Sequence, residues 1–461
     1  MLLASIIGYL ILTVLIGYWA ARRVKTSGDF MLAGRSLPLL LSSSALFATW
    51  FGSETVFGAS SEFLKGGLYA VIEDPFGAAL CLILFGLFFA RKLYNMNLLT
   101  LGDYFEVRYG ARTELLASAF MAPPYMGYIA AQLVAMALIL NVVSGIDIWV
   151  GVVGSAAVVT FYTYVGGMWA ISITDFIQSI IIILGLILLA VVLADKAGGA
   201  SVVFQEVHPD TFRFFPRGEW KDVTAWLAAW SVLGLGSIPS QDVFQRAMSS
   251  GSANTAVRSC YYAAILYLTV AMLPLFISLC TKHLYPGEVT GDTQLTLPIM
   301  VLQHTGTGVQ VLFFGSLLSA IMSTTSSAML APASIFSENL VRPLLKRKLD
   351  DKQMLWLTRG SVLLFSIMAT IMACLRTNIY ELVGESSVLS MVTLLAPLVF
   401  GIYWKRATAF GAMLSMVAGF CAWLVFEFVV DVGIHSLVPA TALSVVALVT
   451  GSLLSRAIRR A

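Results

Sequence analysis

Long runs of apolar residues, separated by short segments that hold most of the charge, follow one another along the whole chain. About 20 mainly apolar residues span a bilayer as a helix, because backbone polar groups find no partner in hydrocarbon outside their own segment. Reading the runs against the charged breaks predicts thirteen membrane helices, approximately over residues 2–20, 38–59, 70–90, 115–142, 148–166, 171–194, 224–243, 259–281, 300–333, 355–375, 384–404, 408–430 and 437–455. We therefore expect an all-α polytopic membrane protein with one membrane domain over 1–461.

The composition of the chain limits the classes of function that are possible. Only 11% of the 461 residues are charged, whereas soluble proteins carry about 25%. The net charge of +3 is too small to indicate nucleic acid, and the five cysteines lack CxxC spacing, so no metal site or disulfide framework is expected. No HExxH or GxxxxGK[ST] motif occurs, and all four histidines fall in or beside predicted outer loops. We expect a protein that is not an enzyme, with no obligate protein partner evident.

The basic residues predict the orientation in the membrane. If the N-terminus is outside, the inner loops hold 21 of the 28 Lys and Arg residues. Cytoplasmic loops carry this excess of positive charge, which places the N-terminus outside and the C-terminus in the cytoplasm of a multi-pass cell membrane protein. The first run lacks the basic start and cleavage site of a signal peptide, so we expect it to remain as a helix.

Two polar stretches inside apolar runs suggest an ion site. Residues 42–55 combine hydroxyl residues, Gly52 and the acid Glu54, which predicts a helix interrupted near Phe51 to Ser53. Carbonyls freed by such a break suit a desolvated Na+, although small residues also form packing faces between helices. In residues 318–328, a 3.6-residue period places Ala320, Ser323, Thr324 and Ser327 on one helix face. Their hydroxyls either replace the hydration shell of a small cation or bond within their own helix.

Two further stretches carry acids. Asp175 enters an apolar helix near its predicted inner end, where an unpaired carboxylate needs a proton, a base or a cation. The alternative is an acid at a helix start, stabilised by the helix dipole. In residues 234–246, Pro239 follows two glycines and precedes Gln241 and Asp242. This pattern predicts either a second interrupted helix that lines a cavity or a helix end near the cytoplasm.

Several short motifs together resemble the sodium:solute symporter family over about residues 1–455. The motifs are Gly34-Arg35-Ser36, Leu101-Gly102-Asp103-Tyr104-Phe105 with Arg108-Tyr109-Gly110, Tyr162-Thr163-Tyr164-Val165-Gly166-Gly167 before Thr174-Asp175, and Ser319-Ala320 to Ser327. Within the family, the chain looks most like the high-affinity choline transporter branch, on the strength of Ala48-Thr49-Trp50, Phe244-Gln245-Arg246 and Leu297-Pro298-Ile299. The resemblance implies a leucine-transporter-type fold: a leading helix and inner loop over 1–37, inverted five-helix repeats over 38–194 and 224–404, and trailing helices over 405–461.

The resemblance also implies Na+ as the coupling ion and assigns residues to its sites. The common Na+ site of the family corresponds here to backbone oxygens of Ala48, Phe51 and Ala320 and to the hydroxyls of Ser323 and Thr324. A second Na+ site, present in some members, corresponds to a set with one acid and three hydroxyls: Asp175, Ser323, Ser326 and Ser327. One or two Na+ ions per cycle are therefore both compatible with the sequence, and Asp175 is alternatively structural.

For the solute, Trp50 and Tyr128 resemble aromatic positions of the choline branch, and a cation over aromatic faces suits such a site. Ser240 departs from the branch, which has another Trp there, while the neighbouring Asp242 can pair with an amine. The expected substrate-binding set is Trp50, Glu54, Tyr128, Ser240, Gln241, Asp242 and Phe244.

These features favour a Na+-coupled symporter that lies in the lipid bilayer and imports a small polar solute by alternating access. An organic cation or amine is favoured, and proline or another amino acid, a carboxylate or a sugar are the alternatives. Proton coupling is the main alternative mechanism, because Asp175 can carry a proton. A channel or a solute sensor are further alternatives, although no signalling domain is evident in the chain.

Overall fold

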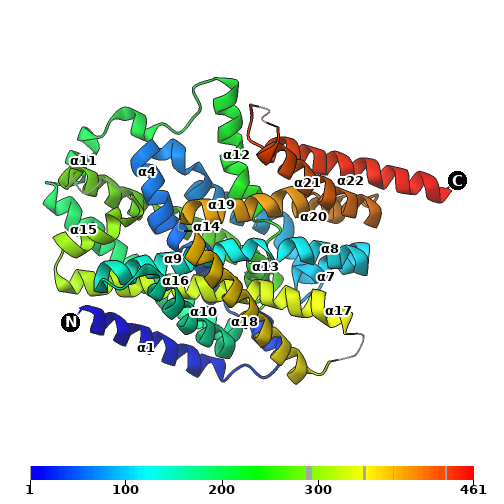
Figure 1. Ribbon diagram of the computed structural model, residues 1–461, viewed down its shortest axis with the longest axis horizontal. Helices are drawn as coiled ribbons and strands as arrows, with labels where there is room; N and C mark the ends of the chain where they lie inside the picture. Colours follow the sequence, from blue (N-terminus) through cyan, green and yellow to red (C-terminus); the bar gives the residue numbers. More distant parts are fainter. Residues whose placement is uncertain (1, 287–292, 346–348, 377, 431–432, 461) are drawn as a thin grey trace.

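The computed structural model describes residues 2–286, 293–345, 349–376, 378–430 and 433–460, and most of them are helical. Figure 1 shows long helices packed side by side, with α1 (Leu2–Ala21) and α22 (Leu437–Arg460) on opposite flanks of the molecule. Within the described residues, extended pairing is limited to one isolated β-bridge, between Leu37 and Ser250. The all-helical prediction is confirmed.

The first half of the chain contains a series of helices, several of them continued by short π-helical segments (η). They are α2 (Ser27–Leu32), α3 (Leu39–Trp50), η2 (Glu54–Ala59), α4 (Ser60–Gly66), η4 (Ile72–Gly77), α5 (Ala78–Leu84), η5 (Phe85–Ala90), α6 (Arg91–Asn95), α7 (Leu101–Tyr109), α8 (Ala111–Met121), α9 (Pro124–Ser144), α10 (Ile148–Lys196) and α11 (Ala200–Glu206).

The second half contains α12 (Trp220–Gly236), α13 (Gln241–Met248), α14 (Ala253–Leu284), α15 (Thr296–His304), α16 (Thr307–Ile335), η9 (Phe336–Val341), α17 (Arg342–Leu344), α18 (Asp351–Leu375), α19 (Ile379–Ser390), η10 (Met391–Leu395), α20 (Ala396–Tyr403) and α21 (Ala409–Phe428). Short 3-10 turns lie at Ala33–Arg35, Gly67–Val71, Pro209–Phe212 and Thr293–Leu295.

The membrane crossings follow the predicted order. Within the described ranges, nine helical stretches are long and apolar enough to span a bilayer, and the bent pair of α12 and α13 makes a tenth. The 49-residue α10 is divided by Gly167, whose φ of 57° is not helical, into the two crossings predicted before and after it. α1 and α3 complete the thirteen predicted helices as shorter apolar segments. Residues 346–348, which hold three of the bases counted in the predicted inner loops, lie outside the described residues.

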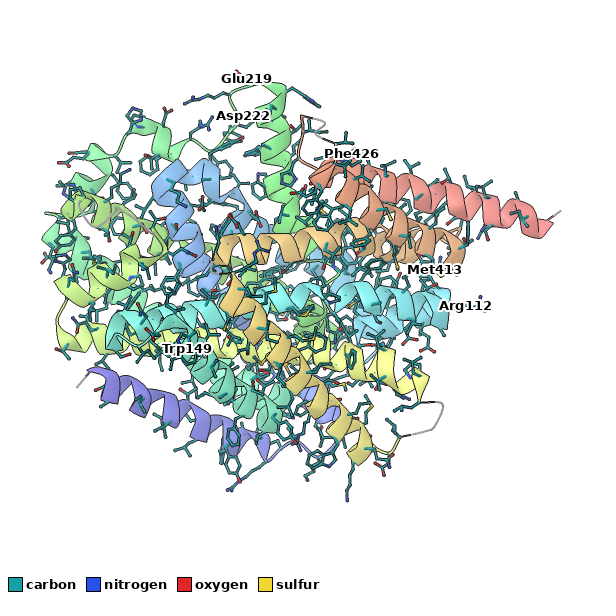
Figure 2. All side chains as sticks on the ribbon, in the orientation of Figure 1. Arg112, Trp149, Glu219, Asp222, Met413 and Phe426 are labelled. Atoms are coloured by element: carbon teal, nitrogen blue, oxygen red, sulfur yellow. The ribbon has the colours of Figure 1, made fainter. Side chains whose placement is uncertain are left out.

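Apolar side chains cover much of the outer surface of the bundle, as contact with lipid requires. Trp149 and Phe161 on α10 and Ile367 on α18 are each more than half exposed. Figure 2 shows Glu219 and Asp222 where α12 begins, at the edge of the molecule. The outer surface is thus apolar along α10 and α18, and charged residues lie where α12 begins.

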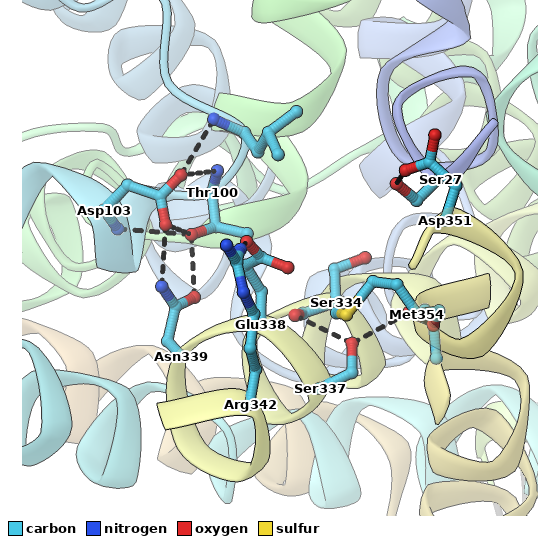
Figure 3. Close-up of polar contacts among 12 residues, drawn as sticks. Ser27, Thr100, Asp103, Ser334, Ser337, Glu338, Asn339, Arg342, Asp351 and Met354 are labelled. Carbon is cyan, nitrogen blue, oxygen red and sulfur yellow. Dashed lines mark hydrogen bonds and ion pairs between the residues drawn. The ribbon is translucent and has the colours of Figure 1, made fainter. Parts of the chain in front are cut away.

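A polar network joins the end of α16 to the start of α7 (Figure 3). Thr100 donates a hydrogen bond to Asn339 on η9 at 2.7 Å, and Asn339 donates to Asp103 at 2.7 Å. Gly102 lies directly against Asn339, because a Cβ at this glycine would be 2.5 Å from the Asn339 side chain. Glu338, the residue before Asn339, pairs with Arg342, which follows it by four residues. The Leu101-Gly102-Asp103 motif therefore forms an interhelical contact.

Candidate ion and substrate sites

The first predicted helix break lies at the centre of the bundle. α3 ends at Trp50, Phe51 leaves the helical region with φ −77° and ψ 72°, and η2 starts at Glu54. The backbone turns so tightly that the Gly52 N–H donates to the Trp50 carbonyl at 2.8 Å. A Cβ at Gly52 would lie 2.8 Å from the Gln132 side-chain oxygen, so a larger residue would require the Gln132 side chain to shift. The prediction of an interruption between Phe51 and Ser53 is confirmed.

Residues of the expected first Na+ site come together where α3 meets α16. The Thr324 hydroxyl donates to the Ala48 carbonyl at 2.8 Å, which fixes the two helices against each other. Ser323 is 1% exposed, and its hydroxyl has no hydrogen-bond partner among the described residues. Ala320 and Phe51 are also buried. A buried hydroxyl without a partner is unfavourable, and a bound cation would satisfy its oxygen.

Asp175 is buried well inside α10. Its side chain is fully buried, and neither carboxylate oxygen has a hydrogen-bond partner in the described part of the chain. Helical backbone resumes after Gly167, so Asp175 lies about two turns beyond that helix start, at 3.6 residues per turn. The helix dipole acts mainly within the first turn. The alternative of an acid at a helix start is therefore wrong.

Helix register predicts that the other members of the second expected Na+ site lie near Asp175. A Cβ at Gly185 on α10 would lie 3.4 Å from the Ser316 hydroxyl on α16. Because α10 and α16 are expected to cross the membrane in opposite directions, moving ten residues along each brings Asp175 opposite Ser326. The Ser327 hydroxyl is buried without a partner, and Ser326 donates to the Ser323 carbonyl at 2.8 Å.

The second predicted break separates α12 from α13. α12 ends at Gly236, the chain is not helical through Ser240, and α13 starts at Gln241 after a bend of 47°. Gly236 lies against the Ser387 carbonyl of α19, where a Cβ would be 2.5 Å away. This arrangement is an interrupted helix inside the bundle, so the alternative of a plain helix end is wrong.

A cavity lies between the two breaks, with about 500 Å³ of space that no protein atom fills, open solvent included. Five of the expected substrate-binding residues line it: Trp50, Glu54, Tyr128, Ser240 and Asp242. Gln241 and Phe244 lie elsewhere. The Gln241 side chain accepts a hydrogen bond from the Leu101 backbone at 2.7 Å, and Phe244 is fully buried in the apolar core.

Tyrosine hydroxyls hold the two acids of the cavity. Tyr125 donates to Asp242 Oδ1 at 2.8 Å and accepts from the Asp242 backbone N–H at 3.0 Å. The Tyr128 hydroxyl lies 2.9 Å from Glu54 Oε1, and Gln132 donates to Glu54 Oε2 at 2.7 Å. None of the described residues that line the cavity is basic.

A third acid, Asp74, lies behind the cavity wall. It accepts hydrogen bonds from Thr55 at 2.9 Å and from Tyr267 at 2.8 Å. The Tyr267 hydroxyl also lies 3.1 Å from the Trp50 carbonyl at the first break. Asp74 therefore helps to hold the broken segment of the chain in place.

Sequence reasoning missed several residues of the cavity. They come from α9, α12, α14 and α19: Pro124, Tyr125, Leu233, Gly236, Ser237, Tyr267, Val383, Ser386, Ser387 and Ser390. Tyr125 stands three residues before Tyr128, so its place on the same helix face was a usable signal. The serines of α19 also interrupt an apolar run. Tyr267 is a single tyrosine in a long helix and gives no such signal.

The comparisons with known proteins agree with this architecture. The profile of the sodium:solute symporter family matches residues 30–419. The human high affinity choline transporter 1 is 30% identical over 440 residues, which cover 90% of this chain and 75% of that protein. The osmoregulated proline transporter of Bacillus subtilis is 26% identical over 476 residues, covering 97% of this chain and 94% of that protein. The chain belongs to the sodium:solute symporter family.

Among solved structures, a Na+-coupled sialic acid symporter in a substrate-bound outward-open state superposes with a TM-score of 0.89. Its sequence is 22% identical, and the match covers 98% of this chain and 97% of that chain. The predicted leucine-transporter-type fold is confirmed. The protein is a multi-pass membrane transporter of a small solute, with Na+ as its coupling ion.

Proposed function

We propose that this symporter imports a small organic cation into the cell together with Na+. The observation that carries the proposal is Asp242, a 97% buried acid on the cavity wall whose Oδ2 makes no hydrogen bond with another described residue. Trp50 supplies an aromatic face in the same cavity, and such faces attract cations. None of the described lining residues is basic, so an anionic solute would find no cation among them.

We propose that two inverted repeats surround this cavity. Residues 38–194 and 224–404 form the repeats, 1–37 lead into them, and 405–461 trail behind. Each repeat begins with a helix that is interrupted at the cavity, at Gly52 in the first and after Gly236 in the second. Half-helix ends and unwound backbone at the membrane midplane are where transporters of this kind bind ions and solutes.

Two Na+ sites accompany the solute in this proposal. The first uses backbone oxygens of Ala48, Phe51 and Ala320 with the hydroxyls of Ser323 and Thr324, and it joins α3 to α16. Its occupancy would hold α3 and α16 together until the solute binds near Trp50, and their separation would release both inside. The second site comprises Asp175 with hydroxyls of Ser323, Ser326 and Ser327. The orphaned oxygens of Asp175 and Ser323 support these assignments.

The proposed orientation has the N-terminus outside and the C-terminus in the cytoplasm of the cell membrane. The distribution of bases supports it, and α1 starts on the left of the molecule in Figure 1 whereas α22 ends on the right. Inward Na+ flow then gains about 2.3 kcal/mol per charge for each 100 mV of membrane potential.

A thermal-stability screen of the purified protein tests the solute class. Amines, quaternary ammonium compounds, amino acids, carboxylates and sugars are compared in NaCl and in KCl. We expect cations to stabilise the protein in NaCl and much less in KCl, and Asp242→Asn to abolish this stabilisation. Stabilisation by uncharged or anionic solutes alone would refute the proposal.

A further inference from the structure

The cavity carries two carboxylates, one contributed by each interrupted helix. Glu54 is the first residue after the first break, and Asp242 is the second residue of α13 after the second break. Each acid is 3% exposed, and both line the cavity. The start of a helical segment favours negative charge, which offsets part of the cost of burying each carboxylate. None of the described lining residues is basic, and the buried Arg246 lies one turn after Asp242 on α13. A ligand with a positive charge at each end would lower the cost of burying both carboxylates.

Neighbouring tyrosines of α9 keep these carboxylates apart. Tyr125 bonds to Asp242 and Tyr128 bonds to Glu54. Residues three apart on a helix are neighbours, with Cβ atoms about 5–6 Å from each other. Each acid is thus anchored to its own hydroxyl along one turn of α9. This arrangement presents two separate anionic points along the cavity, which suits two ammonium groups joined by a short chain.

A count of hydrogen atoms shows that one oxygen of each acid has room for a further hydrogen-bond donor, namely Glu54 Oε1 and Asp242 Oδ2. The Tyr128 hydroxyl has one hydrogen but lies 2.7 Å from the Thr49 carbonyl and 2.9 Å from Glu54 Oε1, so it can fully satisfy only one of them. At the other point, Asp242 Oδ2 receives no hydrogen bond from any described residue. A primary ammonium brings three N–H donors, whereas a quaternary ammonium brings none.

We infer that the solute is a short α,ω-diamine, with one primary ammonium on Asp242 and the other on Glu54. The inference rests on the proposed import of an organic cation and names the class of that cation. Between the two ends, Trp50, Leu233 and Val383 supply an apolar wall for the methylene chain. A quaternary ammonium fits the aromatic face of Trp50 but brings no N–H donor to Glu54 Oε1 or Asp242 Oδ2, and buried acceptors without full hydrogen bonding weaken binding.

The test is equilibrium binding to the full-length protein in lipid nanodiscs, in NaCl and in KCl. The ligands are 1,4-diaminobutane, 1,5-diaminopentane, 1-aminobutane, choline and the bis-trimethylammonium analogue of 1,4-diaminobutane. In NaCl we expect a diamine to bind at least tenfold more tightly than 1-aminobutane, choline and the bis-quaternary analogue. In Glu54→Gln, the ratio of diamine affinity to monoamine affinity should fall towards one.

A matched control is Glu62→Gln, because Glu62 pairs with Lys65 away from the cavity. This variant should keep the diamine preference of the unmodified protein. Equal or tighter binding of choline or of the bis-quaternary analogue would overturn the diamine inference and leave the proposed cation transport intact. Failure of every cation to bind in NaCl would refute the proposed function itself.

Discussion

Ser323→Ala is the cleanest perturbation of the proposed Na+ sites. The Ser323 hydroxyl is buried and makes no hydrogen bond within the described chain, so its removal breaks no contact in the ion-free protein. Because a buried polar atom without a partner is itself unfavourable, the ion-free variant should be as stable as the parent or slightly more stable. The whole cost of the substitution should then appear when Na+ binds.

The size of this cost follows from the loss of one oxygen ligand. A contact between a neutral polar group and a charge contributes about 1.5–3 kcal/mol, and each 1.4 kcal/mol changes affinity about tenfold. Ser323→Ala should therefore weaken Na+ binding about 10- to 150-fold. At a Na+ concentration of about 100 times the parent Kd, ligand stabilisation should fall from about 2.7 kcal/mol to between about 1.4 and 0.3 kcal/mol.

The assay is unfolding of the purified protein in NaCl and in KCl at constant ionic strength. Thr325→Ala is the matched control, because the buried Thr325 hydroxyl donates to the Ile321 carbonyl of its own helix. This control should lower stability equally in both salts and keep the full stabilisation by Na+. Full stabilisation by Na+ in Ser323→Ala would refute the reasoning, as would a loss of stability that is the same in both salts.

Three further predictions concern other contacts. Asp175→Asn removes the acid of the proposed second Na+ site, a buried carboxylate without hydrogen-bond partners among the described residues, so the Hill coefficient for Na+ in uptake should fall towards one; an unchanged coefficient would exclude a second Na+ at this position. Tyr125→Phe removes the side-chain hydroxyl that donates to Asp242, so cation affinity should fall several-fold at unchanged Na+ affinity, and equal losses of both would point to a structural role. Asn339→Ala leaves the Asp103 carboxylate without one of its donors, so the unfolding free energy should fall by about 1–3 kcal/mol, and denaturant unfolding within 0.5 kcal/mol of the parent would contradict this estimate.

The order and approximate limits of the helices were predictable because apolar run length determines membrane crossing. Both helix breaks were also predictable, since Gly52 in one run and Gly236 with Pro239 in the other interrupt regular helix. The predicted separation near Gly167 is also present, because the backbone leaves the helical region at this glycine, with φ 57° and ψ −168°. Sequence spacing alone does not reveal whether a chain reverses or continues after a glycine with positive φ.

The substrate cavity was only partly predictable, for two physical reasons. The face presented by a helix after a break depends on the residue where helical backbone resumes. Because α13 starts at Gln241, Asp242 faces the cavity while Gln241 points to the Leu101 backbone. Residues such as Tyr267 and Ser386 reach the cavity from distant helices, and their place depends on tertiary packing that a single sequence does not contain.

The central claim is that an inward Na+ gradient drives uptake of an organic cation. The most direct measurement is uptake of labelled 1,4-diaminobutane into proteoliposomes with imposed Na+, K+ or proton gradients at a fixed membrane potential. We predict accumulation above equilibrium with the Na+ gradient, collapse of this accumulation when the Na+ gradient is dissipated, and none in Asp242→Asn. Equal uptake without Na+, or accumulation driven by the proton gradient alone, would contradict the account.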